Sequence, residues 1–125
     1  MTIQEAIDRV DTLKPNKYGD DKKIAWLNEV DGLIWREIFL THDGLEPESE
    51  FNGYTADSDM STELLVPSPY TDIYVFYLAC QIDLWNGELT KYANDKTLYN
   101  NAYLTFSDYY NKQHMPLSHV PHFKL

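Results

Sequence analysis

The sequence is poor in cysteine, in basic residues and in long apolar runs. Its single cysteine, Cys80, has no partner for an internal disulfide, so the fold must be stable without crosslinks and a reducing compartment is expected. No run of about 18 apolar residues is present to span a bilayer, and residues 1–5 lack the basic stretch and apolar core of a signal peptide. These absences predict a soluble product made in the cytoplasm.

Basic residues are outnumbered by acidic ones. Ten lysines and arginines face twenty aspartates and glutamates, and the formal net charge at pH 7 is −10. A surface of this sign repels phosphate backbones and gains no affinity by releasing their counterions, so binding to DNA or RNA over a broad face is not expected. The chain has 125 residues, 43% of them hydrophobic and 14% aromatic, which is enough apolar surface for one folded domain.

Motifs of known enzyme chemistry are also missing. The sequence contains no G-x-S-x-G, no G-x-x-x-x-G-K-[ST], no H-E-x-x-H and no G-x-G-x-x-G. Cys80 lies on the apolar side of a predicted helix, where a buried structural thiol is expected instead of a reactive thiolate. Asp20 and Asp21 form a carboxylate pair, but at the start of a predicted helix they are expected to cap it. We therefore predict no enzyme activity and no cofactor.

Apolar periodicity predicts four main helices. Their approximate ranges are 2–14, 20–40, 68–86 and 88–112. Thr2 and Glu5 have the spacing of a capping box at the start of the first helix. Gly87 can supply the left-handed residue that separates the last two helices, which then form a long helical hairpin. The predicted fold class is all-α, with residues 1–112 as a single helical domain.

Two further structural expectations follow from the pattern. The inward stripes of the helices predict one buried core that includes Leu27, Ile34, Ile73, Tyr77, Cys80 and Phe106. The extended run Glu63–Pro67 could pair with Phe51 or Tyr54 in a small β-ribbon beside the helices. Residues 113–125 contain two prolines and no periodicity, so they are predicted to form an extended C-terminal tail.

Residues 41–63 are predicted to form an acidic loop, because they hold no lysine or arginine and are interrupted by glycine and proline. Their acidic residues are Asp43, Glu46, Glu48, Glu50, Asp57, Asp59 and Glu63. The alternation of Asp57, Asp59, Ser61 and Glu63 is similar to a calcium loop. The match fails, because Thr62 stands where the tight-turn glycine is needed and Ser68 where the bidentate glutamate is needed. A solvated acidic loop is the better interpretation.

Histidines in the tail are a weak metal signal. His114, His119 and His122 lie close together in the sequence, and imidazoles are good ligands for zinc or nickel. The spacing matches no closed site with four ligands, so no metal is predicted and an exposed or interface position is favoured.

The fourth helix is dense in tyrosine, which suits surfaces that are apolar at one end and wet at the other. Part of this set is therefore a candidate subunit contact, with ordinary core packing as the equal alternative. The candidate residues are Tyr92, Tyr99, Tyr103, Tyr109 and Tyr110, together with Phe123 of the tail.

Three stretches carry a resemblance to a known family: Glu63–Tyr74, Gln81–Glu88 and the tyrosine- and asparagine-rich helix that ends at Tyr109–Asn111. Together they resemble the small head-tail connector or adaptor proteins of tailed phages and Gram-positive prophages. The likeness spans residues 2–116 and is weakest in the acidic loop. It implies a helical virion protein without catalysis, assembled as a ring below the portal, with the portal and other connector or tail proteins as partners.

Under that resemblance the acidic loop would line the lumen through which DNA passes, and the tail would dock on a neighbouring subunit or on the portal. The expected location is the virion, and the host cytoplasm during assembly.

An alternative of a different class is an acidic inhibitor that mimics DNA and blocks a basic nucleic-acid-binding surface. A mimic should space its carboxylates along a rigid surface, whereas here they cluster in one segment containing glycine and proline.

Overall fold

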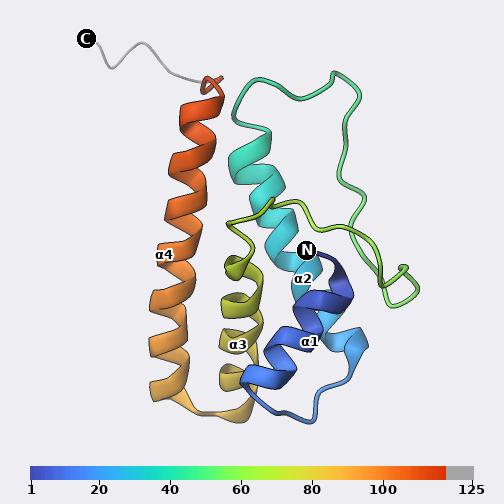
Figure 1. Ribbon diagram of the computed structural model, residues 1–125, viewed down its shortest axis with the longest axis vertical. Coiled ribbons are helices and arrows are strands. Elements are labelled where there is room, and N and C mark those ends of the chain that lie inside the picture. The colour runs from blue at the N-terminus through green and yellow to red at the C-terminus, as the bar shows by residue number, and fades with distance from the viewer. Residues whose placement is uncertain (118–125) are drawn as a thin grey trace.

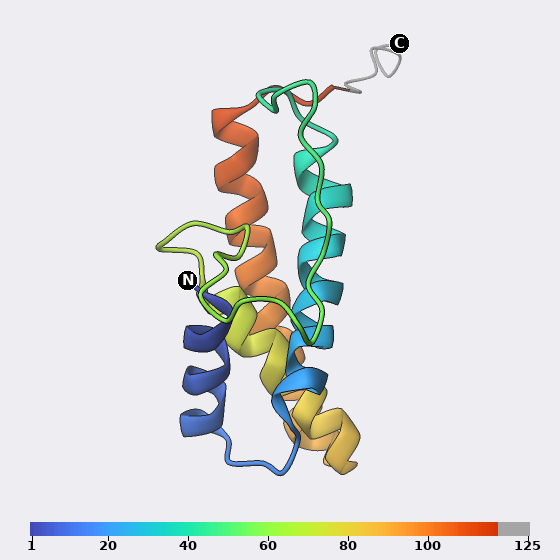
Figure 2. The same ribbon diagram turned by 90° about the vertical axis from the view of Figure 1, so that its right-hand side faces the viewer.

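The computed structural model describes residues 1–117, which form an all-α fold (Figure 1). Its elements are α1 (Ile3–Leu13), α2 (Asp20–Ile34), the π-helical turn η1 (Trp35–Phe39), α3 (Asp72–Asn86) and α4 (Leu89–Gln113). Helices α3 and α4 run antiparallel as a long hairpin, α2 continues into η1, and α1 packs against α2 and α3 (Figures 1 and 2). The predicted all-α class with a helical hairpin is confirmed.

The predicted capping box and glycine C-cap are both present. The Thr2 hydroxyl accepts the Glu5 N–H at 3.1 Å, and the Glu5 carboxylate accepts the Thr2 N–H at 2.9 Å. At the hairpin corner, Gly87 has φ 75°, and the following N–H of Glu88 donates to the Asp83 carbonyl at 2.9 Å. Local sequence signals therefore define the start of α1 and the end of α3.

The start of α2 differs from the prediction that Asp20 or Asp21 caps it. Gly19 is the N-cap and makes no side-chain cap hydrogen bond, while both aspartates lie inside the first helical turn. Their carboxylates there face the positive end of the helix dipole, so they favour the helix by charge instead of by capping. At its other end, α2 continues into η1, where the Leu40 N–H donates to the Trp35 carbonyl at 2.9 Å.

The core contains residues from all four helices and from the connection between η1 and α3. Five of the six predicted core residues are at most 2% exposed: Leu27, Ile34, Ile73, Cys80 and Phe106. Tyr77 is only partly buried, because its hydroxyl reaches outward and donates to the exposed Glu29 carboxylate at 3.1 Å. The core prediction is therefore confirmed except at Tyr77.

The predicted β-ribbon is wrong, since residues 1–117 contain no strand. The extended run beginning at Glu63 instead meets the N-terminus: Glu63 forms an isolated bridge with Thr2, and the Leu64 N–H donates to the Met1 carbonyl at 2.9 Å. Phe51 and Tyr54, the suggested partners, pack elsewhere: the buried Tyr54 bonds to Asp31 of α2, and the partly buried Phe51 packs on Trp35 of η1.

The chain after α4 is held to the end of η1. The Asp43 N–H donates to the Met115 carbonyl at 2.9 Å, and the Leu117 N–H donates to the Thr41 carbonyl at 2.7 Å. The predicted tail began at residue 113, but Gln113 is the last residue of α4 and residues 114–117 are tied down by these bonds. The beginning of the predicted tail is thus part of the folded body.

Candidate functional site

The acidic segment, residues 41–63, leaves the end of η1 and runs back along α2 (Figure 2). Its first six acidic residues, which are the candidates to line a lumen, are all exposed: Asp43, Glu46, Glu48, Glu50, Asp57 and Asp59. The segment contains no lysine or arginine, so no permanently charged cation within it pairs with these carboxylates. The exposed carboxylates therefore form two groups, residues 43–50 and residues 57–59, separated by the uncharged residues 51–56.

The middle of the acidic segment is anchored to α2. The Tyr54 N–H donates to the Asn28 side-chain oxygen at 2.9 Å, and the Phe51 ring packs on Trp35 with centroids 6.3 Å apart. Gly53 has φ 83°, and a Cβ there would lie 2.6 Å from the Asn28 oxygen. A glycine is therefore required for this close approach. These contacts hold the carboxylates near a defined face of the protein.

A buried carboxylate, Asp31 of α2, binds Tyr54 in the acidic segment, Leu65 just after it and Tyr74 of α3. It is 0% exposed and accepts hydrogen bonds from the Tyr54 hydroxyl at 2.5 Å, the Tyr74 hydroxyl at 2.6 Å and the Leu65 N–H at 3.0 Å. Burial raises the pKa of Asp31, and the three donors oppose that rise. We did not predict this role from the sequence, although an aspartate between Val30 and Leu33 of an apolar helix was a visible signal.

A second buried charge cluster lies where α1 meets the hairpin. The Lys14 ammonium is 3.1 Å from Asp83 Oδ1 and 3.4 Å from Asp95 Oδ2. Burial and the nearby Asp95 raise the pKa of Asp83, while Lys14 opposes the rise. The cluster bridges three helices and is closed to solvent at Asp83. Its arrangement is that of a structural ion cluster.

The calcium-like run is divided among different contacts. Asp59 accepts the Ser61 N–H at 2.9 Å and the Ser61 hydroxyl at 2.8 Å, and these bonds lower the pKa of Asp59. Glu63 instead pairs with the N-terminal ammonium of Met1 at 3.3 Å. Within residues 1–117, no three His, Cys, Asp or Glu side chains are placed to hold a metal ion together.

The candidate tyrosines fall into two groups. Tyr99 and Tyr110 are 7% and 8% exposed, so their rings are already covered by packing within the chain. Tyr92, Tyr103 and Tyr109 are half-buried along the edge of the core. Only this second group keeps ring surface that a neighbouring molecule can contact. Phe123 lies outside the described residues.

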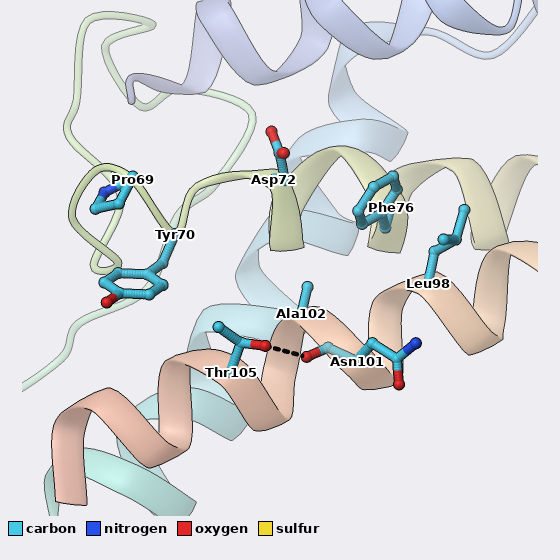
Figure 3. Close-up of a pocket in the computed structure, with 8 residues that line it drawn as sticks. All are labelled: Pro69, Tyr70, Asp72, Phe76, Leu98, Asn101, Ala102 and Thr105. Carbon is cyan, nitrogen blue, oxygen red and sulfur yellow. Dashed lines mark hydrogen bonds between the residues drawn. The ribbon is translucent and has the colours of Figure 1, made fainter. Parts of the chain in front are cut away.

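A groove opens between α3 and α4 (Figure 3). Its volume is about 270 Å³, and its residues are Pro69, Tyr70, Asp72, Phe76, Leu98, Asn101, Ala102 and Thr105. In Figure 3, Phe76 of α3 faces Leu98 and Ala102 of α4, and Tyr70 lies at the α3 N-terminal end. The groove is mainly apolar and was not predicted, because its two walls come from residues that lie 22 to 36 positions apart in the sequence.

The histidines do not gather into one site in the described part of the chain. His42 is buried, with Nδ1 2.6 Å from the Ile38 carbonyl and Nε2 beside the Asn111 side-chain oxygen. His114 stacks on Tyr110 with ring centroids 4.1 Å apart. His119 and His122 lie outside the described residues. The two described histidines thus tie η1 and the C-terminal end of α4 together.

The single thiol is structural, as predicted. Cys80 is 2% exposed, and burial raises its pKa to about 12, so it is a neutral thiol at physiological pH.

Among the described residues, no helix combines the length and the apolar character needed to cross a membrane. Comparison with known proteins adds no identification, since no family model, no curated protein and no solved structure matches the chain.

Proposed function

We propose that the chain is a head-tail connector of a tailed phage or prophage, which forms a homo-oligomeric ring below the portal. The observation that carries this proposal is the acidic segment, in which six exposed carboxylates lie on either side of a middle part that is hydrogen-bonded to α2. In the lumen of a ring, such a surface repels the phosphates of passing DNA and lets the duplex slide. The resemblance of three sequence stretches to the adaptor family supports the same role.

Protein contacts would carry the whole function, with the portal and other connector or tail proteins as partners in the virion. The half-buried rings of Tyr92, Tyr103 and Tyr109 suit a contact between neighbouring subunits, because tyrosine combines apolar area with a polar end. The proposal requires no cofactor, no catalytic group and no membrane.

Electron microscopy of the chain mixed with a purified portal tests this role. We expect an added ring of density on the tail-facing side of the portal, and a portal that gains no such ring contradicts the proposal. A variant that removes three of the six carboxylates, Glu46→Gln with Glu48→Gln and Glu50→Gln, is the matched test of the lumen. It should still add the ring but should slow the movement of DNA through it, because the glutamines no longer repel phosphate.

A second candidate is an acidic inhibitor that occupies a basic nucleic-acid-binding surface. The anchoring of the acidic segment favours it, because Tyr54 and Asn28 keep the carboxylates near a defined face. Competition for a basic DNA-binding protein separates the two functions. Stoichiometric displacement of labelled DNA at physiological salt would favour the inhibitor, and no displacement alongside a ring on the portal would favour the connector.

A further inference from the structure

The groove between α3 and α4 is an uncovered apolar surface with one polar edge. Phe76, Leu98 and Ala102 form its apolar walls, and the stacking of Tyr70 on Tyr109, with centroids 4.7 Å apart, fixes one end (Figure 3). Leu98 is 45% exposed, so residues 1–117 leave this surface open to water. Covering it with apolar side chains would be favourable.

The polar edge suits an extended backbone. The Asn101 side-chain amide makes no hydrogen bond with any described residue, and Thr105 uses its hydroxyl on the Asn101 carbonyl at 2.9 Å. An amide has both donors and an acceptor, so Asn101 can bond to the N–H and C=O groups of an adjacent extended segment. At the rim, Asp72 is paired with Arg9 at 3.3 Å, and both side chains are more than half exposed.

We propose that the C-terminal residues of the same chain, 118–125, dock in this groove. Their sequence, Ser-His-Val-Pro-His-Phe-Lys-Leu, contains one lysine and no acidic residue. The remaining 117 residues hold all twenty acidic side chains and nine of the ten basic ones, so the segment and the body carry side-chain charge of opposite sign. Val120, Phe123 and Leu125 supply apolar groups for the walls, and Lys124 supplies a cation for the Asp72 rim.

The length of this segment matches the position of the groove. Eight extended residues beyond Leu117 reach about 26 Å. At 1.5 Å of rise per residue, Thr105 and Leu98 lie about 12 and 22 Å from the end of α4. A segment of eight residues binds weakly when it is separate, but the covalent link gives it an effective concentration in the millimolar range. The reach of the segment and its covalent link therefore favour docking in the groove of the same chain over docking in the groove of a second copy.

Amide NMR spectra of the full chain and of a chain ending at Leu117 test the proposal. Removing the segment should shift the signals of Phe76, Leu98, Asn101 and Ala102, at every protein concentration tested. Shifts confined to the neighbours of Leu117 would overturn the proposal. Groove shifts that appear only as concentration rises would also overturn it, because they would show docking in a second copy.

Point variants separate docking from folding. Phe123→Ser in the full chain should reproduce most of the shifts seen on truncation, and it changes no residue of the folded body. Ala102→Arg should fill the groove and make the full and truncated spectra alike. Ala93→Arg, at an exposed position of α4 outside the groove, should leave the difference intact. If Phe123→Ser leaves the groove signals where the full chain has them, the proposal is wrong. These measurements use the isolated chain, so their result stands apart from that of the portal experiment.

Discussion

Replacing Tyr74 by phenylalanine measures how strongly the buried Asp31 carboxylate holds the connection between η1 and α3 to the helices. The Tyr74 hydroxyl is buried, donates to Asp31 at 2.6 Å and accepts the Val66 N–H at 2.8 Å. Its removal costs one hydrogen bond to a charged group, about 1.5–3 kcal/mol, and leaves the Val66 N–H unsatisfied, about 1–3 kcal/mol. We therefore expect Tyr74→Phe to lower the free energy of unfolding by about 3–5 kcal/mol.

Two other tyrosines provide the comparison. Tyr54→Phe removes only one bond to Asp31, so its expected cost is about 1.5–3 kcal/mol. Tyr77→Phe is the matched control, because its hydroxyl donates to an exposed carboxylate, Glu29, and water replaces that bond at a cost of at most about 1 kcal/mol. Urea unfolding with an unchanged m-value gives these differences directly. Equal losses for Tyr74→Phe and Tyr77→Phe would refute the reasoning.

The loss of folding stability caused by Tyr74→Phe should depend on pH. Burial holds the pKa of Asp31 above its ordinary value of 3.8, so ionising this group in the folded state lowers stability. That loss is absent below pH 3.8 and develops as the pH rises through the raised pKa. The Tyr74 hydroxyl limits it by stabilising the carboxylate, so Tyr74→Phe should destabilise the protein less near pH 3 than near pH 7. An equal loss at both pH values would show that an ionised carboxylate is not the acceptor.

Three more outcomes are expected. Leu27→Ala should lower the free energy of unfolding by about 2–5 kcal/mol in urea titrations, because Leu27 is 0% exposed in the core. The combined Glu46→Gln, Glu48→Gln and Glu50→Gln variant should keep the wild-type Tm within about 2 °C, since all three side chains are exposed, and a large drop would contradict their solvated position. The isolated chain should scatter light as a monomer or weak oligomer and form its ring only on the portal. Deleting Leu117–Leu125 should abolish that assembly in a complementation assay. A stable ring in solution, or tailed infectious particles from the deletion, would contradict this last expectation.

Elements that depend on neighbours in the sequence were predictable. The capping box of Thr2 and Glu5 and the left-handed Gly87 act within one helical turn, so their residue types suffice to place the ends of helices. The core positions followed from helical periodicity, which puts Leu27 and Ile34 on one face of α2. The exposure of the acidic segment followed from its composition, because so many carboxylates cannot be buried without partners.

Features that depend on distant residues were not predictable. The extended run at Glu63 looked like a partner for Phe51 or Tyr54, yet it pairs with Thr2, because the competition among possible partners is decided by the packing of α1. The groove likewise depends on how far α3 and α4 separate above their corner, which no local signal determines.

The sequence by itself determined an all-α chain with a helical hairpin, a buried thiol and an exposed acidic segment, because these follow from periodicity, caps and charge. Only the tertiary structure decided where that segment is anchored and which polar groups are buried. Asp31 and Tyr74 are 43 positions apart, and Lys14 and Asp83 are farther apart still. The charge of a carboxylate is tolerated in a core only where donors from other elements converge on it. That convergence is a property of the packed helices.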